Sequence, residues 1–560
     1  MTRTAATNGT GRAAAPVTPR EPAGTPQAPT GPAGHAGQAV GSPTPAPRPR
    51  NRTSAYRGGP GFDELVDASG RPRTAAGPLW EALAALGPAG LAARQADAER
   101  EMRSLGATFA VQGDGDATER TWPLDVVPRL VPADEWQVVE AGLVQRLAAL
   151  NRFIDDTYHD QRAVRDGVVP AEVVTGSPNF RPECMGIEPP GGIWAHICGS
   201  DLVRGADGTL FVLEDNLRVP SGVSYMLQNR AVVKRALPDL FRRYSVGPLD
   251  PYLTKLRSVL HAVAPVPHDP VVAVLTPGVA NAAHFEHAFL ARHLGAELVE
   301  AADLQVLDDG TLCMRTIGGL ERVDVVYRRV DDLYLDAEVF RRDSVVGVPG
   351  LLRAMRAGRV AVVNAPGAGV ADDKAVYSYV PDLIRFYLGE DPILPNVPTY
   401  WCGRPAERAH VLANLGSLVM KPATESGGYG VVIGPRAGAG TLDHLARRIE
   451  RNPEGWVAQP VVSLSTAPAL AADGTLQPRH VDLRPFTLLG PAGSYVTRGG
   501  LTRVGASAGS LIVNSSQGGG SKDTWVVEAI LPGPAPDASP PGSAWPGAGG
   551  PPPAHHQAQQ

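Results

Sequence analysis

Residues 421–434 read KPATESGGYGVVIG, where a lysine leads into a small glycine-rich turn and an apolar run follows. Lys421 precedes the glycines and no GK[ST] opens a helix, so the stretch is not a Walker P-loop. A turn of this kind lets backbone N–H groups lie close against phosphates, with Thr424 and Ser426 as further donors. An ordinary hairpin turn is the alternative. The stretch therefore predicts a phosphate-binding turn, with Lys421 reaching an α- or β-phosphate.

Residues 211–222 read FVLEDNLRVPSG and supply oxygen ligands. Glu214 and Asn216 are two apart on a strand, so they share a face, whereas Asp215 points the other way and is expected to be structural. Asp201 lies on the preceding strand of the same hairpin and adds a third oxygen. Hard oxygen ligands suit Mg²⁺ that bridges phosphates. A solvated strand end is the alternative.

Two further stretches offer nucleotide contacts. GVADDKAVY contains Lys374, and a lysine taken alone is most often a solvated one. GWVAQPVV is a strand in which Gln459 is followed by Pro460, and its backbone could hydrogen-bond an adenine. Neither stretch decides the function by itself.

Two strands near the C-terminus gather charged side chains. In RHVDLRPFTLLG, Asp482 and Arg484 share one strand face, and a surface ion pair is the alternative to a functional role. GGLTRVGASAGSLIVNSSQGGGSKDTWV contains Arg503 and Lys522, with strands on both sides. Flanking strands favour a functional loop over a linker.

Periodicity predicts a mixture of α and β elements. Apolar residues from Trp136 to Ile154 step by three and four, which indicates an amphipathic helix. Alternation on both sides of Asp207-Gly208 indicates a β-hairpin whose second strand ends at Asn216. Residues 271–345 alternate strand and helix patterns, and RVAVVN at 359–364 adds a strand, so an open α/β sheet is expected there.

Composition excludes several classes of protein. A net charge of −5 over 560 residues gives no field for nucleic acid or a membrane surface. The four cysteines form no CxxC pair and are expected to be single reduced or buried thiols. No apolar run is long enough for a spanning helix and no secretory signal is visible, so we expect a cytoplasmic protein with no membrane partner.

Together these stretches resemble the ATP-grasp enzymes, which clamp MgATP between two α+β lobes. Those enzymes use two lysines, a glycine-rich loop, a backbone hinge at adenine, an arginine and an acidic-x-Asn metal pair. The matching parts here are Lys374, Lys421, the TESGGYG loop, Gln459–Val461, Arg484 and Glu214-x-Asn216. The metal pair precedes the loop by about 200 residues, the reverse of the common order. That order fits a circular permutation.

The chain is therefore similar to the circularly permuted type 2 ATP-grasp family, itself similar to the synthetase domain of glutathionylspermidine synthase. The resemblance covers roughly 60–528. Its signatures are GSDLVR, VLEDNLRVPSGVSYML, KPATESGGYG, VDLRPF and NSSQGGGSKDTWV.

The resemblance implies an ATP-dependent carboxylate–amine ligase. ATP would phosphorylate a small-molecule or peptide carboxylate to an acyl-phosphate, releasing ADP, and an amine would then form an amide. Mg²⁺ would be held by Asp201, Glu214 and Asn216. The nucleotide would be held by Lys374, Lys421, Thr424, Ser426, Gly427, Gly428, Gly430, Gln459 and Val461. Arg484 would offset transition-state charge, Arg218 and Ser221 would contact the acceptor carboxylate, and Arg503 is a weaker catalytic candidate, as is Lys522.

The resemblance also implies a fold: α/β and α+β, a circularly permuted ATP-grasp fold with a Rossmann-like pre-ATP-grasp βαβ region and disordered tails. The tails are 1–58 and 529–560, both poor in large apolar residues. Residues 59–265 would form an N-terminal helical region plus the metal-binding hairpin. Residues 266–370 would form the pre-ATP-grasp-like domain, and 371–528 the nucleotide-binding lobes.

One departure limits the substrate. Glutathionylspermidine synthase has an arginine two residues before the metal-binding aspartate, and here that position is Gly199. Glutathione and polyamine are therefore not carried over. A MgATP-binding module without turnover, and a kinase that needs no amine, are the alternative functions. The family often occurs beside or fused to a helical domain, so a separate helical partner chain is also expected.

Overall fold

The computed structural model describes residues 56–111, 118–425, 429–513 and 518–532. The expected tails, 1–58 and 529–560, lie almost wholly outside these ranges, and so do Ser426, Gly427 and Gly428. Within the described ranges, no helix is both long enough and apolar enough to cross a membrane.

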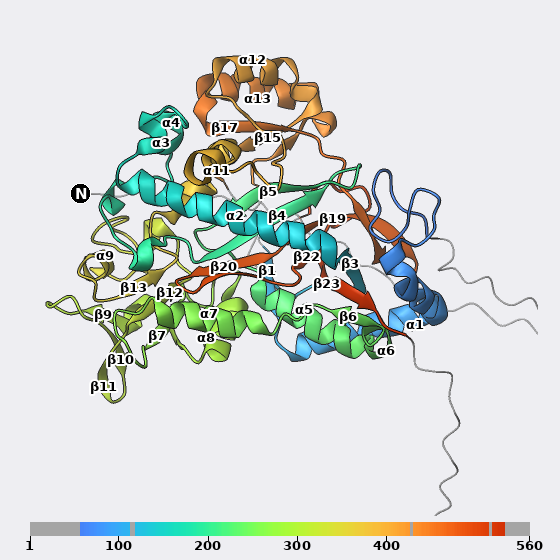
Figure 1. Cartoon of the computed structure of the whole chain (residues 1–560), viewed down its shortest axis with the longest axis horizontal. Helices are drawn as coiled ribbons and strands as arrows, with labels where there is room; N and C mark the ends of the chain where they lie inside the picture. Colours follow the sequence, from blue (N-terminus) through green and yellow to red (C-terminus); the bar gives the residue numbers. More distant parts are fainter. Residues whose placement is uncertain (1–55, 112–117, 426–428, 514–517, 533–560) are drawn as a thin grey trace, which may run out of the picture. The chain divides into compact units, whose positions relative to one another are not determined.

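A large, mostly antiparallel sheet forms the centre of the fold (Figure 1). The order along it is β21-β20-β4-β19-β22-β23-β3, with β5 paired to β4, β6 to β23 and β18 to β19. Its strands are β3 (Leu124–Pro132), β4 (Ile197–Arg204), β5 (Leu210–Asn216), β6 (Tyr244–Val246), β18 (Thr466–Leu470), β19 (Leu476–Arg484), β20 (Phe486–Gly490), β21 (Gly493–Val496), β22 (Leu501–Val504) and β23 (Gly520–Ile530). Strands from 124–246 and from 466–530 thus share one sheet.

Helices cover both faces of this sheet. On β23, Trp525 and Val527 pack with α1 (Gly77–Ser104), α5 (Val223–Ala236) and α7 (Pro251–Ala262). Val526 between them packs with α2 (Ala133–Tyr158) in a separate apolar cluster. Successive strand residues point to opposite faces, so α2 lies on one face and α5 and α7 on the other, as Figure 1 shows. The predicted helix at 136–154 is confirmed as part of α2.

A smaller sheet of four parallel strands has the order β13-β12-β7-β8. Its strands are β7 (Val272–Leu275), β8 (Glu297–Val299), β12 (Val325–Arg328) and β13 (Ala361–Val363). Helix α8 (His284–Leu294) connects β7 to β8, and α9 (Leu351–Arg356) lies between β12 and β13 in the chain. The open α/β sheet expected from 271 to 364 is therefore present.

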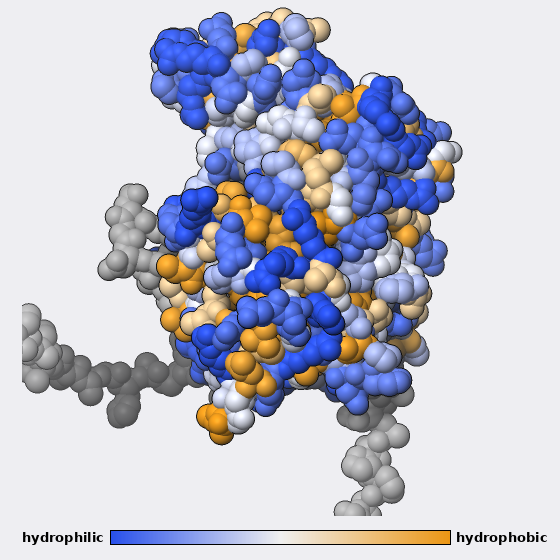
Figure 2. Space-filling model, turned by 90° about the vertical axis from the view of Figure 1, so that its left-hand side faces the viewer, coloured by the Kyte–Doolittle hydropathy of each residue, from blue (hydrophilic) through white to orange (hydrophobic). Residues whose placement is uncertain are grey.

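An antiparallel sheet of β9 (Leu304–Val306), β10 (Leu312–Thr316) and β11 (Gly319–Arg322) follows β8. Figure 2 shows the side of the molecule that carries these strands and α9, where hydrophobic patches lie between hydrophilic ones. The β10–β11 turn exposes Ile317 on that side of the fold.

A third sheet, β14-β17-β15-β16, forms a small lobe with two helices. The lobe consists of β14 (Tyr400–Trp401), α12 (Pro405–Ala413), β15 (Leu418–Pro422), β16 (Val432–Ile433), α13 (Ala439–Arg451) and β17 (Trp456–Pro460). Met420, Ile449 and Trp456 lie in its apolar core. The described strands between residues 371 and 528 are thus divided between this lobe and the large sheet.

The remaining elements connect these parts. They are β1 (Thr108–Val111), β2 (Thr118–Thr121), α3 (Arg162–Arg165), α4 (Ala171–Val174), α6 (Pro238–Phe241), the 3-10 helix η7 (Ala368–Asp372), α10 (Lys374–Tyr377) and α11 (Val380–Leu388). Asn364, just after β13, binds the backbone of the large sheet: its Oδ1 accepts from the N–H of His196 at 2.8 Å, and its Nδ2 donates to Ile197 O at 2.7 Å. This amide fixes the parallel sheet against the start of β4.

Two local predictions can be checked directly. The hairpin on both sides of Asp207-Gly208 is confirmed as β4 and β5, and β5 ends at Asn216 as expected. Asp215 is buried and structural, because Arg146 on α2 donates to its carboxylate at 2.6 Å. All four cysteines are free and buried, as predicted.

Candidate functional site

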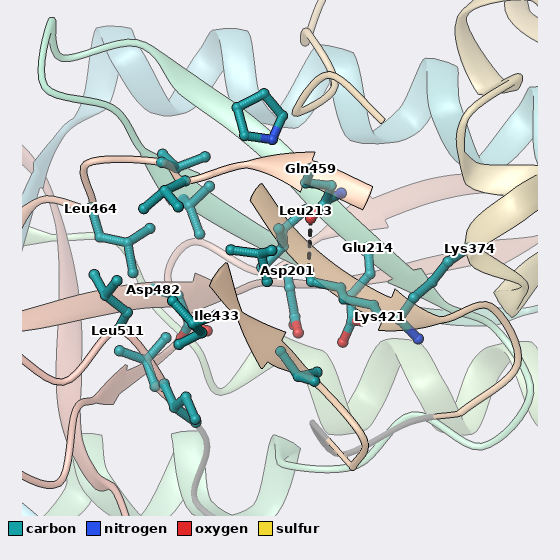
Figure 3. A pocket seen from close by; sticks show the side chains of 18 of the residues that line it. Asp201, Leu213, Glu214, Lys374, Lys421, Ile433, Gln459, Leu464, Asp482 and Leu511 are labelled. Carbon is teal, nitrogen blue, oxygen red and sulfur yellow. Dashed lines mark hydrogen bonds between the residues drawn. The ribbon is translucent and has the colours of Figure 1, made fainter. Parts of the chain in front are cut away.

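A cavity lies between the small lobe and the large sheet (Figure 3). The lobe supplies residues of β15, β16 and β17, and the large sheet supplies residues of β4, β5, β19 and β22. The polar lining includes Asp201, Glu214, Lys374, Lys421, Gln459, Asp482 and Arg503. The apolar lining includes Val203, Leu213, Val419, Ile433, Val461, Leu464, Leu511 and Val513. One cavity thus has an apolar part and a strongly charged part.

Lys421 lies on β15, which pairs antiparallel with β17. Its Nζ donates to Gln459 Oε1 at 2.7 Å, and Gln459 Nε2 donates to Thr399 Oγ1 at 2.9 Å. Burial lowers the pKa of the Lys421 ammonium to about 8, while the nearby Glu214 carboxylate opposes this shift. The ammonium therefore keeps its proton in most molecules at neutral pH and is ready to meet an anion.

Lys374 approaches the same place from the first turn of α10. Its Nζ donates to the backbone oxygen of Glu425, and its backbone N–H donates to Ala423 O at 2.9 Å. Figure 3 shows Lys374 and Lys421 on the same side of the cavity as Glu214. The structure therefore brings both lysines to the edge of the glycine-rich turn.

The described part of that turn lies between this cavity and a neighbouring one. Thr424 and Gly430 line the neighbouring cavity, whereas Glu425 and Tyr429 line both. Gly430 has φ +71°, and a Cβ there would lie 2.8 Å from Pro422 Cγ. Glycine is required at 430 because both the conformation and the space exclude a side chain.

Buried charges from three strands meet at the base of the cavity. Asp201 on β4 accepts from Arg484 Nη2 at 2.8 Å and from Arg503 Nη2 at 2.6 Å. Arg503 Nε also lies 3.0 Å from both oxygens of Asp482. Burial acts to raise the pKa of Asp201, but the two guanidinium groups outweigh it and hold the pKa well below its usual range. Asp201 is therefore an anion at neutral pH.

An ion pair between Asp482 and Arg484 was the alternative to a functional role for these two residues. In the structure each has a different principal partner: Asp482 pairs with Arg503 and Arg484 pairs with Asp201. Lys522 also differs from its prediction, because its Nζ pairs with Asp125 at 2.7 Å in the buried contact between β23 and β3. It does not line the cavity that contains Lys421.

The three residues predicted to bind metal differ in availability. Glu214 Oε1 is 3.9 Å from Arg484 Nη2, and Asn216 Nδ2 donates to Gly199 O at 3.1 Å, which leaves the amide oxygen as an acceptor. Both oxygens of Asp201 already accept from arginine. Within the described residues, no group of three His, Cys, Asp or Glu has metal-site geometry. Carboxylate and amide oxygens at Glu214 and Asn216 fit a hard cation by donor type.

A β-bulge lies beside Asp201 and Glu214 in the pairing of β4 with β5. Asp201 pairs with Glu214 and Leu202 with Val212, so Leu213 is the extra residue on β5. Bulges next to functional sites commonly re-aim side chains. Here Leu213 lines the apolar part of the cavity next to Glu214.

The two residues predicted to contact the acceptor have different surroundings. Arg218 lines a second cavity together with Asn216, and its Nη1 lies 2.9 Å from Asp331 Oδ2. Ser221 Oγ accepts from Arg329 Nη2 at 2.5 Å, and Ser221 does not line that cavity. The sequence did not single out Asp331 or Arg329, because neither stands in a motif.

Asp372 was also missed, although it is two residues before Lys374. Its carboxylate accepts from the N–H of Leu217 at 2.6 Å and lines the second cavity. Burial raises the pKa of Asp372 to about 7, and Arg218 opposes this shift. The GVADDKAVY stretch therefore contributes to both cavities.

The model of the circularly permuted ATP-grasp type 2 family matches residues 128–505. The chain belongs to this family. An uncharacterised protein of Synechocystis sp. is 51% identical over 476 residues, which cover 85% of this chain and 98% of that protein. A Frankia casuarinae protein with the name "Putative glutamate--cysteine ligase 2-2" is 46% identical over 469 residues, which cover 83% of this chain and 54% of that protein. This chain therefore spans about half of the Frankia relative.

Among solved structures, a glutathione synthetase-like effector from Globodera pallida has a TM-score of 0.53 at 13% identity. The match covers 79% of this chain and 98% of that one. At this identity the likeness shows the fold alone.

Proposed function

We propose that this protein is an ATP-dependent carboxylate–amine ligase that forms an amide or peptide bond through an acyl-phosphate and releases ADP. The observation that carries the proposal is the single cavity in which Lys374, Lys421, Gln459 and Glu214 meet, in a chain of the ATP-grasp family. The apolar part of that cavity suits an adenine, and the charged part suits phosphates.

The nucleotide would lie with its adenine against Val461 and Leu464, next to the backbone that follows β17. Lys421 and Lys374 would hold its phosphates together with Thr424 and backbone N–H groups of the glycine-rich stretch that follows it in the sequence. A divalent cation fits the oxygens of Glu214 and Asn216, with Asp201 next to them on the paired strand. When bound there, Mg²⁺ would neutralise phosphate charge.

The chemistry would proceed in two balanced steps. A carboxylate oxygen attacks the γ-phosphorus of ATP, the bond to the β–γ bridging oxygen breaks, and ADP leaves. An amine nitrogen then attacks the acyl carbon, phosphate leaves and the nitrogen loses a proton. The protein contributes positioning and charge neutralisation rather than a covalent intermediate.

Arg484 would provide that neutralisation. Its guanidinium lies between Asp201 and Glu214 and also donates to Ser221 O at 3.3 Å. This position is beside the carboxylates that would hold the cation, so Arg484 would face the developing charge on the γ-phosphoryl group. Arg503 touches Asp201 from the other side and would hold that carboxylate in place.

Gly199 separates this site from the glutathionylspermidine synthase pattern. A Cβ at 199 would lie 3.3 Å from Arg484 Cδ and 3.4 Å from Pro220 Cβ, so these side chains already occupy the space around it. We therefore do not propose glutathione or a polyamine. L-glutamate and L-cysteine are the first substrates to test, because they stand in the name of the Frankia relative.

The full chain should be titrated calorimetrically with a non-hydrolysable ATP analogue plus Mg²⁺, beside Lys421→Met and the exposed control Lys255→Met. We expect binding in the wild type and the control, and much weaker binding in Lys421→Met. ADP release should then require both an acid and an amine. Release with the acid alone, with a stable phosphorylated product, would favour a kinase. Binding without turnover against an acid–amine panel would favour a MgATP-binding module.

A further inference from the structure

The second cavity lies at the carboxyl edge of the parallel sheet. Pro277 and Asn281 follow β7, and Arg329 and Asp331 follow β12. The strand that follows β7 in the chain, β8, pairs on one side of β7, and β12 pairs on the other side. Loops that leave neighbouring strands in opposite directions open a crevice, and open α/β sheets bind ligands there. The position of the cavity in the fold is therefore that of a ligand site.

The cavity has the size and the neighbours of a substrate pocket. Its volume is about 400 Å³, within the range of small-molecule sites. Asn216 lines it, whereas Glu214 on the same face of β5 lines the nucleotide cavity. Residues two apart on a strand are about 7 Å apart. A ligand in the second cavity would therefore lie next to the proposed phosphate site.

Opposite charges face one another across this cavity. Arg218 Nη1 lies 2.9 Å from Asp331 Oδ2, and Arg218 Nε lies 3.7 Å from Asp372 Oδ2. The Arg218 side chain is 17% exposed and that of Asp331 is 37% exposed. One guanidinium faced by two carboxylates can bind a carboxylate and an ammonium of the same ligand.

The other cation of the cavity is committed to the protein. Arg329 Nη2 lies 3.0 Å from Glu286 Oε1, and Arg329 Nη1 donates to Pro220 O at 2.8 Å. Its Nε has no hydrogen-bond partner among the described residues, although Arg329 is buried. Arg329 thus builds the wall of the cavity. Among the described residues that line it, Arg218 is the other cation, and its guanidinium can contact a ligand.

Packing holds Arg218 in position. A Cβ at Gly369 would lie 2.9 Å from Arg218 Cδ and 3.2 Å from Asp332 Oδ2, so the arginine lies directly over this glycine. Asp332 is itself fixed, because Arg328 Nη1 lies 2.6 Å from its Oδ1. A guanidinium held in this way loses little conformational entropy when a ligand binds.

Apolar groups complete the lining. Val219, Pro277, Val330, Val346 and Tyr334 line the cavity beside its charges. An apolar wall next to a paired cation and anions suits a small ligand with a charged head and a side chain. These features distinguish the cavity from a simple phosphate site, which would not need two carboxylates.

We infer that the second cavity binds one substrate of the ligase as a free α-amino acid, with Arg218 on its carboxylate and Asp331 and Asp372 around its ammonium. The inference rests on the proposed function in one respect only, which is that the ligand is a substrate. The ligand chemistry follows from the charges of the cavity alone.

The test uses the full chain and ligand-observed NMR with the standard L-amino acids as probes, with and without Mg²⁺ and a non-hydrolysable ATP analogue. Calorimetry then compares each amino acid that binds with its N-acetyl derivative and its carboxamide. We expect both derivatives to bind about tenfold more weakly or worse, because each loses one charge-assisted contact.

Three variants assign the contacts. Asp331→Asn should weaken binding of the amino acid about tenfold and binding of its N-acetyl derivative little. Arg218→Gln should weaken binding of the amino acid about tenfold and binding of its carboxamide little. Gly369→Ala should weaken binding of the amino acid, because the added Cβ displaces the Arg218 side chain. Asp239→Asn, which removes an exposed partner of Arg242, is the matched control and should change nothing. Affinity for the ATP analogue should stay unchanged in all four.

The two proposals fail in different ways. If the protein binds the ATP analogue but no amino acid, or binds the N-acetyl derivative equally well, the assignment of the second cavity is wrong. If amino acids bind as expected and the ATP analogue does not, the ligase proposal fails and the ligand chemistry of the cavity stands.

Discussion

Asp482 on β19 lies directly opposite Arg503 on β22, and Arg503 Nε is 3.0 Å from both oxygens of the Asp482 carboxylate. Arg503 also donates to Asp201, so one guanidinium joins two buried carboxylates from strands that are far apart in the sequence. This relationship makes the charged base of the nucleotide cavity part of the structural core.

We expect Asp482→Ala to destabilise the fold by ~3 kcal/mol, because it removes one partner of a buried ion pair and leaves Arg503 undercompensated. Urea unfolding of the variant and the wild type measures this difference. Asp239→Ala, which breaks the exposed pair with Arg242, should leave the free energy of unfolding unchanged. Equal losses in the two variants would contradict a structural role for Asp482.

The affinity for ATP should fall as the pH rises through about 8. The pKa of the free Lys421 ammonium is about 8, so this group loses its charge above that pH and with it the attraction to phosphate. Bound phosphate should raise the same pKa, so binding near pH 8 should take up protons. Calorimetry in buffers of different ionisation enthalpy detects this uptake. Lys421→Met should bind weakly and show no such dependence, and an unchanged profile in that variant would place the titrating group elsewhere.

Glu214→Gln should abolish ADP release and weaken Mg²⁺ binding about tenfold, since an amide replaces the charged oxygen ligand. Competition with Mn²⁺, followed by electron paramagnetic resonance, measures the metal directly and does not depend on turnover. Glu450→Gln on α13 makes the same substitution at an exposed position, and this control variant should behave as the wild type. Normal metal affinity in Glu214→Gln would remove this residue from the metal site.

Gly430→Ala should destabilise the protein by ~1–2 kcal/mol, because a non-glycine residue at positive φ is strained. The substitution should also weaken ATP binding, since the Cβ would press on Pro422 at the end of the strand that carries Lys421. Thermal unfolding and calorimetry measure the two effects. Gly438→Ala is the matched control, because its φ is −71° and no atom lies within 4 Å of the added Cβ. Equal stability of the two variants would show that the 430 position tolerates a side chain.

The sequence predicted the site best where the signal is local. Glu214 and Asn216 share a strand face because strand residues alternate, and the hairpin turn at Asp207-Gly208 fixes which strand lies beside them. Lys421, which precedes the glycine-rich stretch, was likewise predicted from the order of residues. These features need only the geometry of one or two neighbouring strands.

The contacts that it missed depend on register between distant strands. Arg503 reaches Asp201 only because β22 pairs with β19 and β19 with β4. A single sequence does not show which strands pair, so it did not identify the partners of Asp482 and Arg484. Lys522 was misplaced for the same reason, since its partner Asp125 comes from the parallel neighbour β3.

The second cavity was not visible in the sequence because no motif marks it. Its charged residues include Arg218, Asp331 and Asp372, which are far apart in the sequence. They line one cavity only because of the order of the parallel strands and the position of η7. The sequence identified Arg218 alone, from its place just after Asn216. Its two acidic neighbours required the fold.

The hydrogen bond between Gln459 and Thr399 lies where the chain crosses between the small lobe and the rest of the molecule. The lobe begins with β14 at Tyr400 and ends with β17 at Pro460, and these two strands are neighbours. Both crossings therefore lie side by side. The lobe is held to the rest of the molecule at a second place as well, where the backbone N–H of Lys374 donates to Ala423 O at 2.9 Å. Any rotation of the lobe that moved Lys421 relative to Glu214 would have to break this bond, so the position of the charged residues depends on both attachments.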